Sequence, residues 1–186
     1  FSTYTLAGSF SFAGLFVFVA GSPVIFMDGF HVSVQAYGAI FALLAGGMIG
    51  GGQLNLLLIR RFSGRGIFKA ALLVQLIVGS CFLAGSMSGL GYGLVPTIAF
   101  LFVLLASAGI TYPNAAGIAL EPFTWNAGSA SALFGFIQLG LGSLLSAAVG
   151  LSDTQGALPV AAVIACSSFV GLLILIVSEA RQLRLG

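Results

Sequence analysis

The chain has 186 residues, of which 59% are hydrophobic and only 5% are charged, and its mean hydropathy is +1.17. A soluble domain carries roughly 25% charged residues, so this composition excludes a water-soluble domain and indicates a polytopic membrane protein. The formal net charge of +2 is small, and the positions of the charges are more informative than their sum.

Six apolar stretches are long enough to cross a bilayer, which takes about 20 mostly apolar residues. Short segments that contain turn formers and charges separate them. We therefore expect an all-α membrane protein with six transmembrane helices in one bundle and no second domain. In chain order the predicted spans are 4–26, 37–59, 67–87, 95–116, 129–150 and 157–178.

The chain begins at Phe1 without an initiator Met or a signal-peptide pattern, so we expect a fragment or a processed piece. The first span is aromatic, and we interpret most of its Phe residues as packing or lipid contacts. A minority of them, together with Tyr4, could line an apolar binding cavity. Pro23 predicts a bend near the outer end of this span.

The second span carries small residues on one helical face. Small residues allow another helix to approach closely. Two interpretations stay open: tight packing inside the bundle, or a smooth face that slides against a partner bundle. The face consists of Gly38, Ala42, Gly46, Gly50 and Gln53.

The basic residues indicate an orientation. Arg60, Arg61, Arg65 and Lys69 form a predicted basic loop between the second and third spans, and the remaining arginines, 181 and 184, follow the sixth span. With six spans, both places lie on one side of the membrane. Positive charge is retained in cytoplasmic loops, so we expect this side and both termini to be cytoplasmic.

The cysteines lie within predicted spans, Cys81 in the third and Cys166 in the sixth. We interpret both as small, buried apolar residues. They lack the CxxC or Cys/His spacing of a metal or redox site. No metal or cofactor is therefore expected. We also expect no nucleic-acid partner.

The fourth span carries Ser107, Thr111 and Asn114 at helical spacing, and Pro113 predicts a helix kink. Proline also leaves the backbone carbonyl near Gly109 without its donor. Exposing these groups to lipid would cost roughly several kcal/mol. The stripe must therefore face protein or a water-filled cavity, and the sequence leaves both alternatives open.

The fifth span repeats the small-residue pattern of the second, and the same two interpretations apply. The centres of all spans carry essentially no ionisable side chain, although proton relays usually contain such groups. The stripe consists of Gly128, Ser131, Gly135, Gln138, Gly142, Ser146 and Gly150. The similarities between the two sets of three spans suggest a pair of inverted three-helix repeats.

Four segments carry a resemblance to a known family. "YPNAAGIAL" followed by "NAGSASALFGFIQLGLGSLLSA" resembles the tenth and eleventh helices of Bcr/CflA-type drug:proton antiporters of the major facilitator superfamily. The segment "AGLFVFVAGSPVIFMDGFHVSVQAYGAIFALLAGGMIGGGQLN" is similar to their seventh and eighth helices. The loop "NLLLIRRFSGRG" resembles their degenerate basic loop. The resemblance covers nearly the whole chain, in order.

The resemblance implies the carboxy-terminal six-helix half of a twelve-helix transporter in the bacterial inner membrane. It implies alternating access, amphipathic small-molecule substrates, and protons carried by the absent amino-terminal half. The first and fourth spans would line the cavity, with Tyr4, Thr111, Tyr112, Asn114 and Gln138 as candidates. The second and fifth spans would contact the other half, through Gly46, Gly50, Gln53, Ser131, Gly135 and Gly142.

Two other functions compete with transport. An intramembrane serine protease would need a base beside Ser129 or Ser131, but the only histidine, His31, is expected on the opposite side of the membrane, so we do not expect an enzyme. A six-helix channel or a module that pairs with itself as a homodimer would use the same small-residue faces. Channels usually show charge rings or carbonyl-rich filters, and neither is visible in the sequence.

Overall fold

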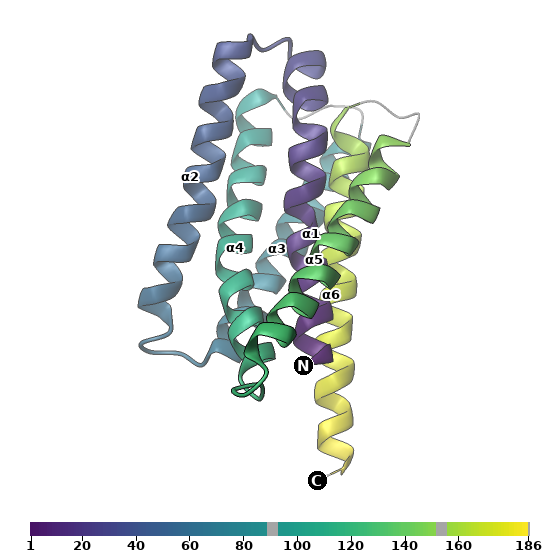
Figure 1. The fold of residues 1–186 in the computed structure, drawn as a ribbon. Helices are drawn as coiled ribbons and strands as arrows, with labels where there is room; N and C mark the ends of the chain where they lie inside the picture. The colour runs from purple at the N-terminus through teal and green to yellow at the C-terminus, as the bar shows by residue number, and fades with distance from the viewer. Residues whose placement is uncertain (89–92, 152–155, 186) are drawn as a thin grey trace.

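The computed structural model describes residues 1–88, 93–151 and 156–185, which form six long helices (Figure 1). Each helix is long and apolar enough to cross a membrane. The six predicted spans and the all-α class are confirmed, while the predicted breaks after the third and fifth spans include residues 89–92 and 152–155, outside the described ranges. The helices are α1 (Ser2–Pro23, continued by a π-helix, η1, Val24–Gly29), α2 (Val34–Leu58), α3 (Gly64–Met87), α4 (Leu94–Leu120), α5 (Ala127–Gly150) and α6 (Ala157–Leu185).

Serine caps set the beginnings of two helices. The Ser33 hydroxyl accepts a hydrogen bond from the Ala36 backbone at the start of α2, and Ser63 accepts one from Gly66 at the start of α3. These caps begin each helix three residues before the predicted span. Arg65 and Lys69 consequently lie in the first turns of α3, not in a loop as predicted.

The helices are arranged around α1 and α4. Helix α1 packs against α4, α5 and α6, whereas α4 packs against α1, α2 and α3, and α3 packs against α6. Helix α2 lies mainly against α4 and α5 mainly against α1, so both flank the bundle (Figure 1). In the most apolar 18-residue stretch of each helix, only 22% of the residues of α2 and 17% of those of α5 are buried, compared with 50% for the first helix, α1 with η1.

This contact pattern has an internal symmetry. Exchanging the triplet α1–α3 with α4–α6 turns the α1–α5 contact into the α4–α2 contact, and the α1–α6 contact into the α4–α3 contact. The first helix of each triplet begins at a different end of the bundle: α1 begins at the end where both termini lie, and α4 begins at the opposite end (Figure 1). Two inverted three-helix repeats produce this arrangement.

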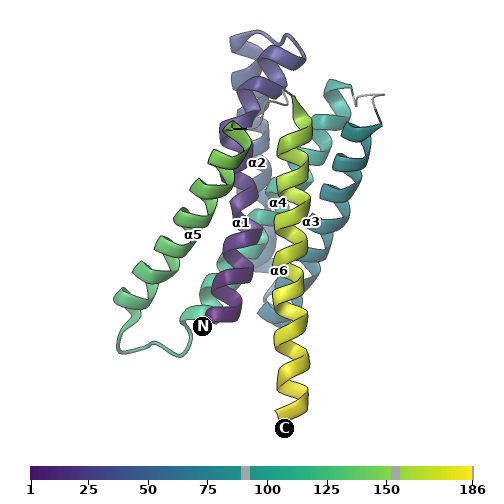
Figure 2. The same ribbon diagram turned by 90° about the vertical axis from the view of Figure 1, so that its right-hand side faces the viewer.

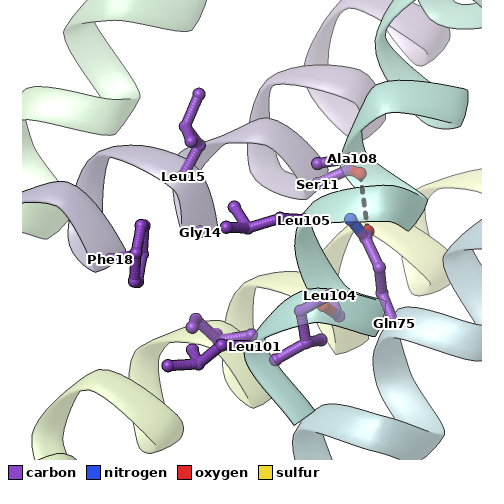
Figure 3. A pocket seen from close by; sticks show the side chains of 11 residues that line it. Ser11, Gly14, Leu15, Phe18, Gln75, Leu101, Leu104, Leu105 and Ala108 are labelled. Carbon is purple, nitrogen blue, oxygen red and sulfur yellow. Dashed lines mark hydrogen bonds between the residues drawn. The ribbon is translucent and has the colours of Figure 1, made fainter. Parts of the chain in front are cut away.

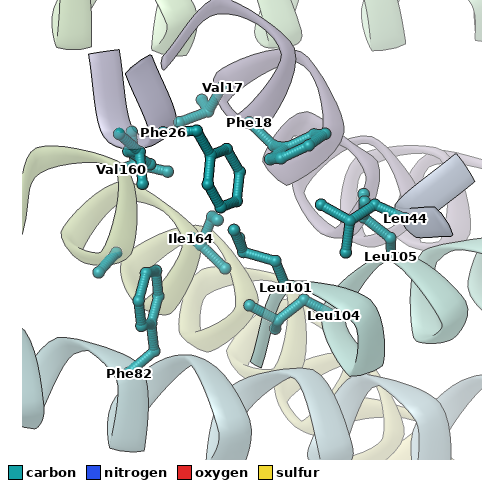
Figure 4. Close-up of a cluster of buried hydrophobic side chains, with 12 residues drawn as sticks. Val17, Phe18, Phe26, Leu44, Phe82, Leu101, Leu104, Leu105, Val160 and Ile164 are labelled. Atoms are coloured by element: carbon teal, nitrogen blue, oxygen red, sulfur yellow. The ribbon is translucent and has the colours of Figure 1, made fainter. Parts of the chain in front are cut away.

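Close packing holds the described helices together, because lipid tails remove most of the hydrophobic driving force between them. Gly8 lets α1 touch α4, since an added Cβ there would overlap Ala115. One core cluster, drawn in Figure 4, consists of Val17, Phe18, Ile25, Phe26, Leu44, Phe82, Leu101, Leu104, Leu105, Val160, Ala161 and Ile164. A second consists of Ala7, Phe68, Leu72, Ala115, Ala119, Phe134, Leu172 and Leu175.

The end of α1 differs in detail from the prediction. Instead of a simple bend at Pro23, the α-helix passes into the π-helical turn η1 at Val24. Proline lacks a backbone donor, which favours such a change in hydrogen-bond register. The Ser22 and Tyr37 hydroxyls lie 2.9 Å apart and tie this end of α1 to α2.

The prediction that both cysteines are buried is wrong. Cys81 on α3 and Cys166 on α6 are exposed on the surface of the bundle. In a membrane protein the lipid-facing surface is as apolar as the interior. An apolar residue type therefore does not distinguish burial in protein from contact with lipid.

Candidate substrate-facing site

The five predicted cavity residues lie in three different environments. Tyr112 and Gln138 lie on α4 and α5, on the side where these helices meet α1. Thr111 and Asn114 are buried in contacts between helices. Tyr4 lies against Phe68, near the amino-terminal end of α1.

An aromatic cluster joins α1, α4 and α5. The ring of Tyr112 lies 4.9 Å from that of Phe12 and 6.3 Å from that of Phe134, measured between centroids. Phe12 in turn lies 5.9 Å from Phe16. Tyr112 remains 40% exposed. Aromatic walls with few polar groups are typical of sites for amphipathic small molecules.

Gln138 is a buried polar side chain next to this cluster. It is 6% exposed, and its Nε2 atom has no hydrogen-bond partner among the described residues. Phe134 and Gly142 lie one turn away on the same face of α5. Leaving a buried donor unpaired costs about 1–3 kcal/mol, so the position would suit a polar partner from outside this chain.

Two hydroxyls that the sequence analysis missed lie on the facing helix. Thr5 and Ser9 are fully buried, and their oxygens have no hydrogen-bond partner among the described residues. With Phe12 and Phe16 they form one stripe of α1 at helical spacing, and Phe16 packs on Gly142 of α5. The signal in the sequence was two hydroxyl residues followed by two aromatic residues at helical spacing, at positions 5, 9, 12 and 16.

A hollow opens on this side of the bundle, at its basic end, which is the end that carries Arg60, Arg61 and Lys69. Figure 2 shows α5 diverging from α1 toward the first turn of α5. The hollow has a volume of about 430 Å³, within the range of about 300–1,000 Å³ that small-molecule pockets occupy. Its lining is Phe1, Phe123, Asn126, Ser129, Ala130 and Leu133.

Thr111 lies in a contact between helices, which is one of the two alternatives that the sequence leaves open. Its hydroxyl is 2.7 Å from that of Ser11 on α1, and Ser11 donates a 2.7 Å hydrogen bond to the Gln75 Oε1 atom on α3 (Figure 3). The cavity beside Ser11 and Gln75 has a volume of only about 10 Å³, room for about one water molecule. Thr111 is therefore packed between helices in this bundle, and its place in a substrate cavity stays a prediction.

Asn114 also lies in a contact between helices. Its Nδ2 donates to the Asn55 Oδ1 atom on α2 at 2.6 Å and to the Ile110 carbonyl at 2.8 Å. Helix α4 continues as an α-helix through Pro113. The carbonyl of Gly109, which proline deprives of a donor, lies beside Gly52 of α2. The kink itself stays a prediction.

The predicted inter-half residues lie mostly on open surfaces. Gln53 and Ser131 are exposed, and an added Cβ at Gly46, Gly50 or Gly135 would meet no atom within 4 Å. Gly142 is the exception. It is buried against the ring of Phe16, so the prediction that it faces outward is wrong.

The described basic residues gather at one end. Lys69 of α3 and Glu179 of α6 form a 2.6 Å ion pair there. Arg60 and Arg61 lie in the turn that follows α2, at the same end of the bundle as both termini (Figure 1). His31 follows η1 at the opposite end, whereas Ser129 lies in the first turn of α5, so the two cannot form a catalytic pair.

Two known proteins are similar to this chain over most of its length. The uncharacterized MFS-type transporter YdgK of Bacillus subtilis is 28% identical over 176 residues, covering 92% of this chain and 42% of the relative. A bicyclomycin resistance protein homolog of Haemophilus influenzae is 26% identical over 156 residues, covering 84% of this chain and 39% of the relative. No family model matches the chain.

Its homologues are major facilitator transporters. The resemblance seen in the sequence is thereby confirmed, and these relatives are transporters rather than enzymes. The chain spans about two fifths of the length of each of them. Together with the six apolar helices, this describes a multi-pass membrane protein consistent with half of a transporter.

Proposed function

We propose that this chain is the carboxy-terminal half of a proton-coupled multidrug efflux antiporter of the bacterial inner membrane. The observation that carries the proposal is the pair of unpartnered small-residue surfaces on α2 and α5, which flank α1 and α4 on the outside of the bundle. A second six-helix half seated on these surfaces would enclose a central cavity. Rocking of one half against the other would then give alternating access.

The substrate-facing site of this half is the cluster of Phe12, Tyr112 and Phe134 with Gln138 beside it. Its rings would contact an apolar body, and the glutamine amide would donate to an oxygen of the substrate. This chemistry fits amphipathic, neutral or cationic small molecules. It is in keeping with a relative that is named for resistance to bicyclomycin.

Proton coupling is assigned to the amino-terminal half. The centres of the spans in this chain carry no carboxylate, the usual carrier in such relays. The basic end and both termini are placed in the cytoplasm by the positive-inside rule. The energy for export would come from protons moving inward against the outgoing substrate.

The test uses the full-length protein in inverted membrane vesicles, with bicyclomycin and an amphipathic cationic dye as probes. We expect accumulation of at least one probe inside the vesicles, abolished by a protonophore. Accumulation that persists without a proton gradient would refute the coupling. Failure to transport either probe at normal expression would refute the efflux assignment.

The alternative is a membrane module in which α2 and α5 pair with a second copy of this chain. The same open glycine surfaces favour it. A Gly46→Cys substitution, in a protein without the two native cysteines, distinguishes the two. Disulfide-linked dimers formed through Cys at this position would favour self-association, and protection of this cysteine by the other half would favour the transporter.

A further inference from the structure

A groove lies between α2 and α3 at the basic end of the bundle, apart from the substrate-facing site. Its volume is about 520 Å³, and its floor is formed by Ser107 and Ile110 of α4. The turn that joins the lower ends of α2 and α3 (Figure 1) contributes Phe62 and Ser63 to its lining. Its walls are Leu58, Phe62, Ser63, Gly66, Ile67, Ala70, Ala71 and Val74.

The packing of the helices explains the groove. Helix α2 packs mainly against α4, so α2 and α3 are held apart on either side of it. Small side chains at Gly66, Ala70 and Ala71 keep the space between them empty. The bulky walls remain accessible, since Phe62 is 61% exposed and Val74 is 40% exposed.

The groove is suited to a purely apolar occupant. Its polar lining residues are two serines, and both already have partners. Ser107 donates to the Val103 carbonyl at 2.8 Å, and Ser63 accepts from the Gly66 backbone. The Ser107 hydrogen is therefore taken, and the Ser63 hydroxyl is the one side-chain donor that the described lining leaves for a polar drug, whereas a hydrocarbon chain needs none.

Two cations lie in the chain between residues that line the groove. Arg60 and Arg61 lie in the chain between Leu58 and Phe62, which both line the groove, and their exposed side chains form no ion pair with any described residue. The neighbouring cations differ. Lys69 is paired with Glu179. Arg65 lies on the face of α3 that points away from the groove, where it interacts electrostatically with Tyr4.

We infer that this groove binds an acyl chain of an anionic phospholipid whose phosphate group is held by Arg60 and Arg61. Guanidinium groups match the geometry of phosphate oxygens, and basic pockets between membrane helices suit anionic lipid headgroups. The two neighbouring cations match the charge of the phosphate, and the apolar lining matches the acyl chain, so together they favour this occupant. The inference depends on the membrane-spanning bundle and not on the transport reaction.

The test measures lipid retention by the purified full-length protein, using native mass spectrometry with phosphatidylglycerol and phosphatidylcholine of identical acyl chains. We expect preferential retention of phosphatidylglycerol. Arg60→Gln and Arg61→Gln should each weaken its binding about fivefold, and together about 25-fold. Arg65→Gln is the matched control and should leave binding unchanged, because that charge lies on the other face of α3.

A second pair of variants tests where the acyl chain lies. Ala70→Trp should fill the groove and weaken retention of both lipids, whereas Ala84→Trp, on the same face of α3 two heptads away, should not. Ala70→Leu provides a milder filling if the Trp variant unfolds, and thermal unfolding of each variant reports its folding.

Several results would overturn the inference. Equal binding of the two lipids would exclude a specific headgroup site. An equal loss in Arg65→Gln would indicate diffuse electrostatic attraction instead. Unchanged binding in both Ala70 variants would place the acyl chain elsewhere, and displacement of the lipid by a transported dye would make the groove a drug site.

Discussion

Gln138 and Asn114 are both buried amides in the membrane-spanning region, yet their hydrogen bonding differs. Asn114 donates to Asn55 and to a backbone carbonyl, so its donor is satisfied within the bundle. The Gln138 donor has no partner among the residues that the structure describes. A satisfied amide stabilises a helix contact, whereas an unsatisfied one is available to a ligand. The two residues should therefore respond differently to the same substitution.

Gln138→Leu in the full-length protein should impair transport without impairing folding. Removing an unpaired buried amide costs little stability, and loss of one hydrogen bond to the substrate, about 0.5–1.5 kcal/mol, weakens binding about 2–10-fold. The KM for drug transport and the unfolding temperature are measured together. An unchanged KM would remove Gln138 from the substrate-facing site.

Asn114→Leu should instead lower stability, because it leaves the Asn55 amide buried and unpaired, at a cost of about 1–3 kcal/mol. A double-mutant cycle with Asn55→Leu isolates the pair, with an expected coupling energy of about 0.6–1.7 kcal/mol. Unfolding in mixed detergent micelles is the measurement. Strictly additive effects would show that the hydrogen bond contributes nothing to stability.

Helix α2 has two different glycine surfaces at the element scale. Gly47 and Gly51 lie against Phe102 and Ala106 of α4, where an added Cβ would collide. Gly46 lies on the opposite side of the same turns, with no atom nearby. One set therefore fixes α2 to α4 as a rigid pair. The other set is left for a partner outside this chain.

Gly109→Ala and Gly46→Ala form a matched pair that tests this division. The new Cβ at Gly109 would overlap the Met48 backbone carbonyl, and such overpacking costs about 1–3 kcal/mol. Gly46→Ala should leave the unfolding temperature nearly unchanged but slow transport, if α2 slides against a second half. Equal unfolding temperatures for the two variants would contradict the close α2–α4 contact.

Charge asymmetry is the main feature at the scale of the whole molecule. Arg60, Arg61 and the Lys69–Glu179 pair lie at one end with both termini, while His31 lies at the other (Figure 1). Successive connections between helices lie at alternate ends of the bundle. Labelling one connection at each end is therefore enough to determine how the bundle is oriented in the membrane.

Cysteine labelling should give opposite results for the two ends. In a protein with Cys81→Ala and Cys166→Ala, a membrane-impermeant maleimide added to intact cells should label His31→Cys and spare Trp125→Cys. Trp125 is 97% exposed in the turn between α4 and α5, so access is not limited by the protein itself. Inverted vesicles should reverse the pattern. Labelling of both positions from one side would refute the six-span topology.

The sequence alone determined the number of helices, their approximate ends and the gathering of basic residues at one end. These properties are local, because a span must match the bilayer thickness and a charge must stay near its surface. The sequence also revealed stripes of small residues at helical spacing. Helix ends were missed by a few residues where Ser33 and Ser63 provide caps.

Only the tertiary structure decided which side of each helix meets protein. It placed Thr111 and Asn114 in helix contacts, turned Gly142 inward, exposed both cysteines and brought Tyr112 to Phe12. In water, polarity separates the surface of a protein from its core. In a bilayer both the surroundings and the core are apolar, so the burial of a residue depends on the fit between neighbouring helices, which a single sequence does not encode locally.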